Sequence, residues 1–198
     1  MVTITYRNAD INLDEQVYDP AEDSYLLADV AIDNARSGMK VLEVGAGTGF
    51  VSAVLQSNVD VDLIATEISP LAASCARSNN VEVIRADMFS CFRTGTAFDL
   101  ILFNPPYLPT AEDEKVPRWL NYAFDGGPDG RDAVNRFIDE VSKYLKSDGM
   151  ILILISSLTG IEQVKERMED HGFKVETCGS DRDCFFEELV VLKGILQP

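Results

Sequence analysis

The stretch Glu43-Val44-Gly45-Ala46-Gly47-Thr48-Gly49 ends a short apolar run, and another apolar segment begins at Phe50. Glycines let a chain turn sharply and let a ligand approach the backbone amides at the N-terminus of the next helix. The spacing is not the dinucleotide fingerprint GxGxxG, because Phe50 stands where the third glycine would be. No lysine follows the glycines, which excludes a P-loop. We interpret the stretch as a ligand-binding turn after a strand, the alternative being a turn that binds nothing.

Apolar runs rich in β-branched residues alternate with amphipathic stretches from Lys40 onward. The expected strands are Val41–Val44, Val61–Ala65, Val81–Ile84, Phe98–Phe103, Met150–Ile155, Phe173–Cys178 and Phe185–Leu192. The expected helices are Ala21–Arg36, Phe50–Gln56, Pro70–Ser78, Asp132–Lys146 and Ile161–His171. This alternation predicts an α/β fold with a mostly parallel sheet and helices on both faces. A short polar turn, Gly179–Asp183, predicts that the last two strands form an antiparallel hairpin, with Glu187 and Glu188 at an edge or in solvent.

Composition limits the class of protein. The 198 residues predict one domain, and 17 basic against 33 acidic side chains give a formal net charge of −16. Such a charge argues against binding a polyanion through the whole surface, and it also suits adaptation to high salt. The densest apolar run, Met150–Ile155, is far shorter than the ~20 residues of a membrane span. Without CxxC spacing and with His171 as the single histidine, we expect no metal site and a cytoplasmic protein with reduced thiols.

Two acidic residues end the strands that follow the glycine turn. Glu67 comes after Ile64-Ala65-Thr66, and Asp87 follows the next run. A carboxylate at the position of Glu67 can accept hydrogen bonds from both hydroxyls of a ribose, as in nucleotide-binding α/β folds. Asp87 could accept a hydrogen bond from the amino group of adenine. Either acid alone would be interpreted as a solvated loop residue. Together they favour an adenosine ligand, and the lack of a phosphate-neutralising lysine favours a cationic one.

The most specific motif is Asn104-Pro105-Pro106-Tyr107, after the fourth run. The two prolines lack backbone N–H groups and stiffen the turn. The Asn104 side-chain oxygen and the Pro105 carbonyl can then accept hydrogen bonds from a substrate NH₂ group, while Tyr107 offers a flat face to a planar amide or base. Holding both hydrogens directs a weakly nucleophilic nitrogen at an electrophilic methyl group, so catalysis would depend on positioning and electrostatics.

These motifs together resemble class I S-adenosylmethionine-dependent methyltransferases that act on a planar NH₂ group. Two more motifs are similar to those of the HemK/PrmC family of protein-glutamine N5-methyltransferases, in its short archaeal and eukaryotic branch. They are Val17-Tyr18-Asp19-Pro20-Ala21-Glu22-Asp23-Ser24 and Asp125-Gly126-Gly127-Pro128-Asp129-Gly130-Arg131. The resemblance implies a Rossmann-like, seven-stranded methyltransferase domain over residues 1–198, in which residues 1–39 form a strand and helix that cover the cofactor site.

The resemblance also implies roles for single residues. Asn104, Pro105 and Tyr107 would hold the substrate glutamine. S-adenosyl-L-methionine would be the cofactor, and the residues around it would be Ser24, Glu43, Gly45, Gly47, Glu67, Asp87, the Met88 backbone and Asn104.

The implied substrate is the Gly-Gly-Gln loop of a class I peptide-chain release factor. Bacterial members dock it with an N-terminal helical domain, whereas the first helix expected here begins at Ala21. Short relatives pair with a small zinc-binding activator protein, and we expect such a partner at the strand Val81–Arg85. Two alternatives stay open: N-methylation of an exocyclic amine of adenine or cytosine in RNA or DNA, and a scaffold that binds the cofactor without catalysis.

Overall fold

The computed structural model describes residues 2–110, 119, 124–181 and 187–197. Two sheets and five α-helices make up the described part of the chain. The strands are β1 (Val2–Tyr6), β2 (Ala9–Leu13), β3 (Lys40–Val44), β4 (Asp62–Glu67), β5 (Val83–Arg85), β6 (Phe98–Phe103), β7 (Leu145–Ser156), β8 (Phe173–Asp181) and β9 (Leu189–Leu196). The helices are α1 (Glu22–Asn34), α2 (Phe50–Asn58), α3 (Pro70–Ser78), α4 (Asp132–Val141) and α5 (Ile161–Asp170).

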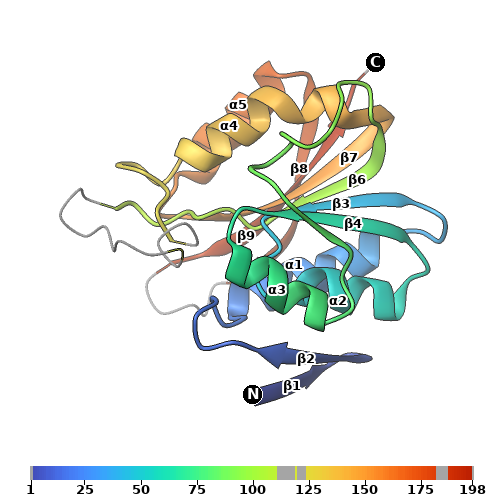
Figure 1. Cartoon of the computed structure of the whole chain (residues 1–198). Coiled ribbons are helices and arrows are strands. Elements are labelled where there is room, and N and C mark those ends of the chain that lie inside the picture. Colours follow the sequence, from blue (N-terminus) through green and yellow to red (C-terminus); the bar gives the residue numbers. More distant parts are fainter. Residues whose placement is uncertain (1, 111–118, 120–123, 182–186, 198) are drawn as a thin grey trace.

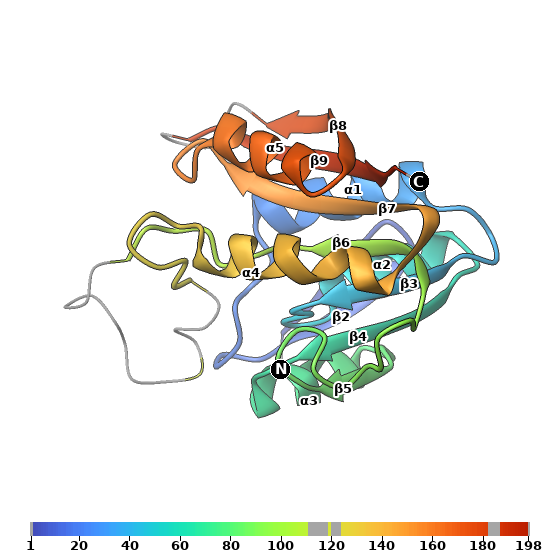
Figure 2. The same cartoon turned by 90° about the horizontal axis from the view of Figure 1, so that it is seen from above.

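The large sheet has seven strands in the order β5-β4-β3-β6-β7-β9-β8 (Figure 2). Strands β3, β4, β5, β6 and β7 are parallel to their neighbours among themselves, and β9 is antiparallel to both β7 and β8. The predicted parallel sheet with a C-terminal antiparallel hairpin is therefore confirmed. The carboxyl ends of the parallel strands lie along one edge of this sheet, and the predicted motifs follow β3, β4 and β6 there.

Helices α1, α2 and α3 cover one face of this sheet, and α4 and α5 cover the other (Figure 1). Alternate residues of a strand point to opposite faces, and β6 shows this directly. Leu100 and Leu102 pack with the core of the first face, while Ile101 and Phe103 pack with that of the second. Burial on both sides explains the nearly continuous apolar runs. In the part of the chain that the structure describes, no helix has the length and hydropathy to cross a membrane.

Two details of the sequence-based prediction were wrong, and a third lies outside the described residues. The helix expected to reach Lys146 ends at Val141, because Leu145 already pairs with Phe98 in the β6–β7 ladder. The turn expected from Gly179 starts later, because the edge strand β8 stays paired with β9 as far as Asp181. Residues 182–186, which include the expected start of the last strand at Phe185, lie outside the described residues, and β9 begins at Leu189.

The N-terminal segment contains a hairpin that the sequence analysis did not anticipate. Strands β1 and β2 form a separate antiparallel sheet, drawn below α2 and α3 in Figure 1. The buried Asn79 side chain joins it to the glycine turn. Its Oδ1 accepts from Asn12 N at 2.8 Å, and its Nδ2 donates to Asn12 O at 3.0 Å and to Thr48 O at 2.8 Å. The hairpin thus supports the glycine turn from outside the large sheet.

The third glycine of the turn is required by packing. Gly49 has φ +79°, and a Cβ there would lie 3.0 Å from Ala76 of α3 and 3.0 Å from Val81. Gly47 has φ +55°, but a Cβ on it would meet nothing within 4 Å. Gly49 therefore lets α2 approach α3, whereas Gly47 borders open space.

We predict that Gly49→Ala destabilises the fold more than Gly47→Ala. Both variants put a side chain at positive φ, which costs roughly 1–2 kcal/mol, and overpacking at Gly49 adds roughly 1–3 kcal/mol. Urea unfolding of the two variants measures the difference. Equal losses of unfolding free energy would contradict the packing role assigned to Gly49.

Candidate active site

A cavity of about 1630 Å³ opens at the carboxyl ends of β3, β4 and β6. Small-molecule sites usually measure ~300–1,000 Å³, so this one has room for a cofactor and part of a second reactant. Every site residue predicted from the sequence lines it: Ser24, Glu43, Gly45, Gly47, Glu67, Asp87, Met88, Asn104, Pro105 and Tyr107. The fold therefore brings together residues from five separate segments, although their individual roles stay predictions.

The carboxylate of Glu67 connects the end of β4 to the glycine turn. Its two oxygens accept hydrogen bonds from the backbone N–H of Gly47 at 2.9 Å and of Ser69 at 2.8 Å. Burial raises the pKa of Glu67, and these backbone donors oppose the rise. The side chain is 7% exposed, so the carboxylate is held rigidly at the cavity wall.

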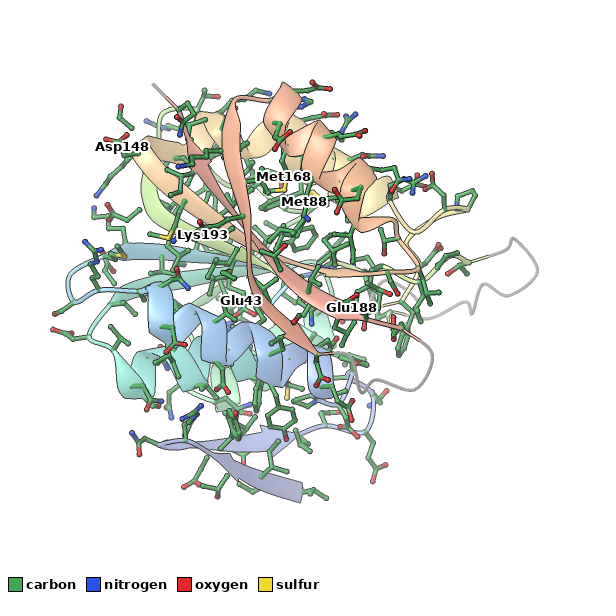
Figure 3. The ribbon with its side chains drawn as sticks, turned by 180° about the vertical axis from the view of Figure 1, so that it is seen from behind. Glu43, Met88, Asp148, Met168, Glu188 and Lys193 are labelled. Atoms are coloured by element: carbon green, nitrogen blue, oxygen red, sulfur yellow. The ribbon has the colours of Figure 1, made fainter. Side chains whose placement is uncertain are left out.

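Glu43 lies deeper, in the middle of the molecule (Figure 3). Its carboxyl group accepts from the Ser52 backbone N–H at 3.0 Å and is also hydrogen-bonded to the Ser52 hydroxyl, which ties β3 to α2. Burial raises the pKa of Glu43 to about 8 despite these donors, and the nearby Glu67 carboxylate adds to the rise. Burial therefore favours the protonated form of this group.

Asp87 and Met88 form the far end of the cavity wall, after β5. The exposed carboxylate of Asp87 is paired with Arg136 of α4 at 2.9 Å. Met88 has φ +45°, an unusual conformation for a residue with a side chain. The arginine was not anticipated from the sequence, and it occupies one oxygen of the carboxylate that was expected to face adenine.

Asn104 follows β6 and lines the cavity. Its Nδ2 donates to Asp23 Oδ2 at 3.0 Å. Its Oδ1 is buried and has no hydrogen-bond partner among the described residues. An unsatisfied buried carbonyl is costly unless a ligand supplies the missing donor, so this oxygen is suited to accept from a bound NH₂ group.

The loop after Asn104 rests on two other segments. Thr159, after β7, donates its hydroxyl to Tyr107 O at 3.2 Å. The Asp125–Arg131 motif packs against the other side, where a Cβ on Gly130 would lie 2.4 Å from Tyr107 O and one on Gly126 would lie 2.9 Å from Pro106 O. The glycines of that motif therefore allow backbone to lie directly against the Asn-Pro-Pro-Tyr turn, a role that only the structure reveals.

Asp23 is a site residue that the sequence analysis missed, although it stands inside the quoted Pro-Ala-Glu-Asp-Ser stretch. It belongs to the first turn of α1 and is 3% exposed. Besides Asn104, it accepts from the hydroxyls of Tyr18 at 3.3 Å and Tyr107 at 3.5 Å. Burial, reinforced by the Asp23 charge, raises the pKa of both tyrosines. Both hydroxyls therefore stay protonated and remain donors.

Other polar and aromatic side chains complete the rim. Glu187 was expected at an edge or in solvent, but it lines the cavity and is hydrogen-bonded to the Ser156 hydroxyl. Trp119 and Phe124 also line it, and Phe124 packs edge-on against Tyr18 with ring centroids 5.3 Å apart. Among residues 2–110, 119, 124–181 and 187–197, no cluster of three histidine, cysteine or acidic side chains could hold a metal ion.

Comparisons with known proteins agree with this geometry. The profile of a family described as "Methyltransferase domain" matches residues 35–185. A Methanocaldococcus jannaschii protein that bears the name protein N5-glutamine methyltransferase is 43% identical, over 93% of this chain and 94% of its own. Human methyltransferase HEMK2 is 34% identical, over 89% and 88% of the two chains.

A solved structure gives the same result in three dimensions. It is the E. cuniculi Mtq2–Trm112 complex, described as responsible for the methylation of the eRF1 translation termination factor. It matches with a TM-score of 0.75 and 26% identity, over 91% of this chain and 98% of that one. The chain belongs to the class I methyltransferases, in the HemK/PrmC family of protein N5-glutamine methyltransferases.

Proposed function

We propose that this enzyme methylates the side-chain nitrogen N5 of the glutamine in the Gly-Gly-Gln motif of a class I peptide-chain release factor, with S-adenosyl-L-methionine as methyl donor. The observation that supports it most is the buried, unpartnered Oδ1 of Asn104 beside two prolines. The names of the relatives support the protein substrate. A release factor as substrate places the reaction in the cytoplasm.

The cavity fits a cationic adenosine cofactor. Apart from Arg136, which is paired with Asp87, the charged side chains among the described residues that line it are carboxylic acids. The open space beside Gly47 leaves room for a ligand against the backbone. S-adenosylmethionine, when bound, supplies an electrophilic methyl group on a positively charged sulfur. We assign the ribose to Glu67 and the adenine to Asp87 with the Met88 backbone.

The remaining predicted residues surround the other end of the cofactor. Gly45 and Gly47 offer backbone at the turn, and the Glu43 carboxyl group lines the same cavity. Ser24, in the first turn of α1, is buried, lines the cavity and is assigned to the cofactor's carboxylate.

Asn104, Pro105 and Tyr107 act on the substrate amide. The Asn104 Oδ1 and the Pro105 carbonyl each accept a hydrogen bond from the NH₂ group, which localises the nitrogen lone pair and orients it for attack. Tyr107 lies against the amide plane. After transfer the nitrogen carries an extra proton and is strongly acidic, so no strong base is needed. The contribution of the protein is positioning and electrostatic stabilisation.

We predict that Asn104→Ala reduces methyl transfer by about 10²–10³-fold while cofactor affinity stays nearly unchanged, because the lost group contacts the acceptor nitrogen. Turnover on a purified release factor and calorimetric titration with S-adenosylhomocysteine measure the two effects separately. An active variant, or one that fails because the cofactor no longer binds, would contradict the assignment.

Glu67→Ala should weaken S-adenosylhomocysteine binding by about tenfold or more, because a hydrogen bond to a charged group contributes ~1.5–3 kcal/mol. Asp87→Ala should have a smaller effect, since that carboxylate is exposed and already paired with Arg136. Glu67→Gln is a second variant that removes the charge and keeps the size, but its single oxygen can accept from only one of the Gly47 and Ser69 amides. Unchanged affinity of Glu67→Ala for S-adenosylhomocysteine would show that the ribose binds elsewhere.

We further propose that a small zinc-binding activator protein pairs with the edge strand β5. The Ala65 N–H donates to Glu82 O at 2.8 Å, and the Ala86 N–H donates to Glu67 O at 3.0 Å. The backbone groups of Glu82 and Ala86, which flank β5, therefore face β4. By the alternation of a strand, the backbone of Val83 and Arg85 faces outward. The Val83 carbonyl already accepts from the Arg77 side chain at 3.1 Å. The Val83 N–H and the Arg85 backbone are the groups with which the edge could receive a partner strand through backbone hydrogen bonds.

Val83→Pro should abolish this pairing, because it removes an outward N–H. Co-purification of the chain with its activator, followed by titration calorimetry, measures the loss, expected at about tenfold or more. Glu82→Ala, at an exposed position of the same segment, is the matched control. The variants must first show equal melting temperatures alone. Normal binding by Val83→Pro, or full activity of the wild-type chain without any partner, would overturn the proposal.

A further inference from the structure

We infer that Asp23 is a positioning residue: it fixes the orientation of the Asn104 amide and so makes the site select a carboxamide over a carboxylate. The inference rests on the proposed function, since it assigns a cause to the preference for glutamine over glutamate. It concerns a residue that contacts Asn104 and Tyr107 directly and acts on the substrate through them.

The contact between Asp23 and Asn104 is chemically consistent with only one orientation of the Asn104 amide. A carboxylate has acceptors only, whereas an asparagine side chain has one accepting oxygen and one donating NH₂ group. With Asp23 Oδ2 at 3.0 Å from the Asn104 nitrogen, the NH₂ group must face Asp23. The reversed amide would place two oxygens in contact without a hydrogen between them. Asp23 therefore determines that Oδ1 is the atom of Asn104 left for a ligand.

Asp23 is itself held in place. Its Oδ1 accepts from the backbone N–H of Ser24 at 2.6 Å and from the Ser24 hydroxyl at 3.1 Å. The position in the first turn of α1 favours a negative charge. Tyr18 donates its hydroxyl to the same carboxylate at 3.3 Å. A buried carboxylate with several donors has little freedom to turn away from Asn104.

The consequence is that Asn104, Pro105 and Pro106 present only hydrogen-bond acceptors to a ligand, and we call these three residues the acceptor wall. Asn104 offers Oδ1 alone, and Pro105 and Pro106 have no N–H to add. A glutamine side chain brings the NH₂ group that such a wall can bind. A glutamate carboxylate of nearly the same shape would meet oxygen with oxygen, which is costly in a buried site. Loss of Asp23 would let the Asn104 amide rotate and present a donor instead.

The test compares Asp23→Asn with Asp33→Asn, which makes the same substitution at an exposed position of the same helix, outside the residues that line the cavity. For each variant we would measure kcat on a release factor, S-adenosylhomocysteine affinity, and competition by Gly-Gly-Gln and Gly-Gly-Glu peptides. Asp23→Asn should lower kcat by about 100-fold, as expected for a misplaced reacting group. It should also reduce the preference for the glutamine peptide, with cofactor affinity retained. Asp33→Asn should resemble wild type in all three measurements.

A swapped pair separates orientation from simple structural damage. Asn104→Asp alone puts two carboxylates together, whereas Asp23→Asn with Asn104→Asp restores one donor and one acceptor, with the donor now on residue 23. The double variant should exceed both single variants in kcat and should again prefer the glutamine peptide. A double variant no better than the single ones, or an Asp23→Asn variant with wild-type kcat and selectivity, would overturn the inference.

A spectroscopic readout works even if the release factor proves not to be the substrate. In protein labelled with ¹⁵N-asparagine, the Asn104 side-chain NH₂ should be protected from exchange in the wild type and lose this protection in Asp23→Asn. An unchanged Asn104 signal would refute the role of Asp23. Absence of wild-type activity on the release factor, with the signal behaving as expected, would instead refute the proposed substrate.

Discussion

The parallel pairing of β3 with β4 on one side and β6 on the other is the constraint on which the site depends. Parallel strands end at the same edge of a sheet, so the glycine turn, Glu67 and Asn104 meet there although they are far apart in the chain. The pairing is stabilised by burial of both faces under two layers of helices. Ligands of open α/β sheets bind at this edge.

A second feature gives the site its chemistry: donors and acceptors are separated between its two halves. The glycine turn supplies backbone N–H groups, and one of them is held by the Glu67 carboxylate. The Asn-Pro-Pro-Tyr turn supplies acceptors, since its prolines lack N–H groups and its asparagine NH₂ is taken by Asp23. Under the proposed function, the cofactor would lie against the first half and the substrate NH₂ group against the second.

The elements and the cavity residues were predictable where a local pattern specifies them. Apolar runs predicted the strands of the large sheet, and the motifs at their ends, with the one that precedes and begins α1, gave the predicted residues that line the cavity. The contacts that hold the motifs in place were not predictable, because they join segments distant in sequence. The pair Asp23–Asn104, the pair Asp87–Arg136 and the packing of Gly130 on Tyr107 all depend on tertiary structure. The early end of α4 has the same cause, since pairing with β6 prevails over helical periodicity at Leu145.

The central claim is that the acceptor wall around Asn104 receives the glutamine of a release factor. Mass-spectrometric mapping after incubation with S-adenosylmethionine, release factor and RNA together, with and without the activator, tests it most directly. We expect one added methyl group on the glutamine of the Gly-Gly-Gln motif and none on the RNA. Methyl groups found on adenine or cytosine, with the release factor unmodified, would contradict it.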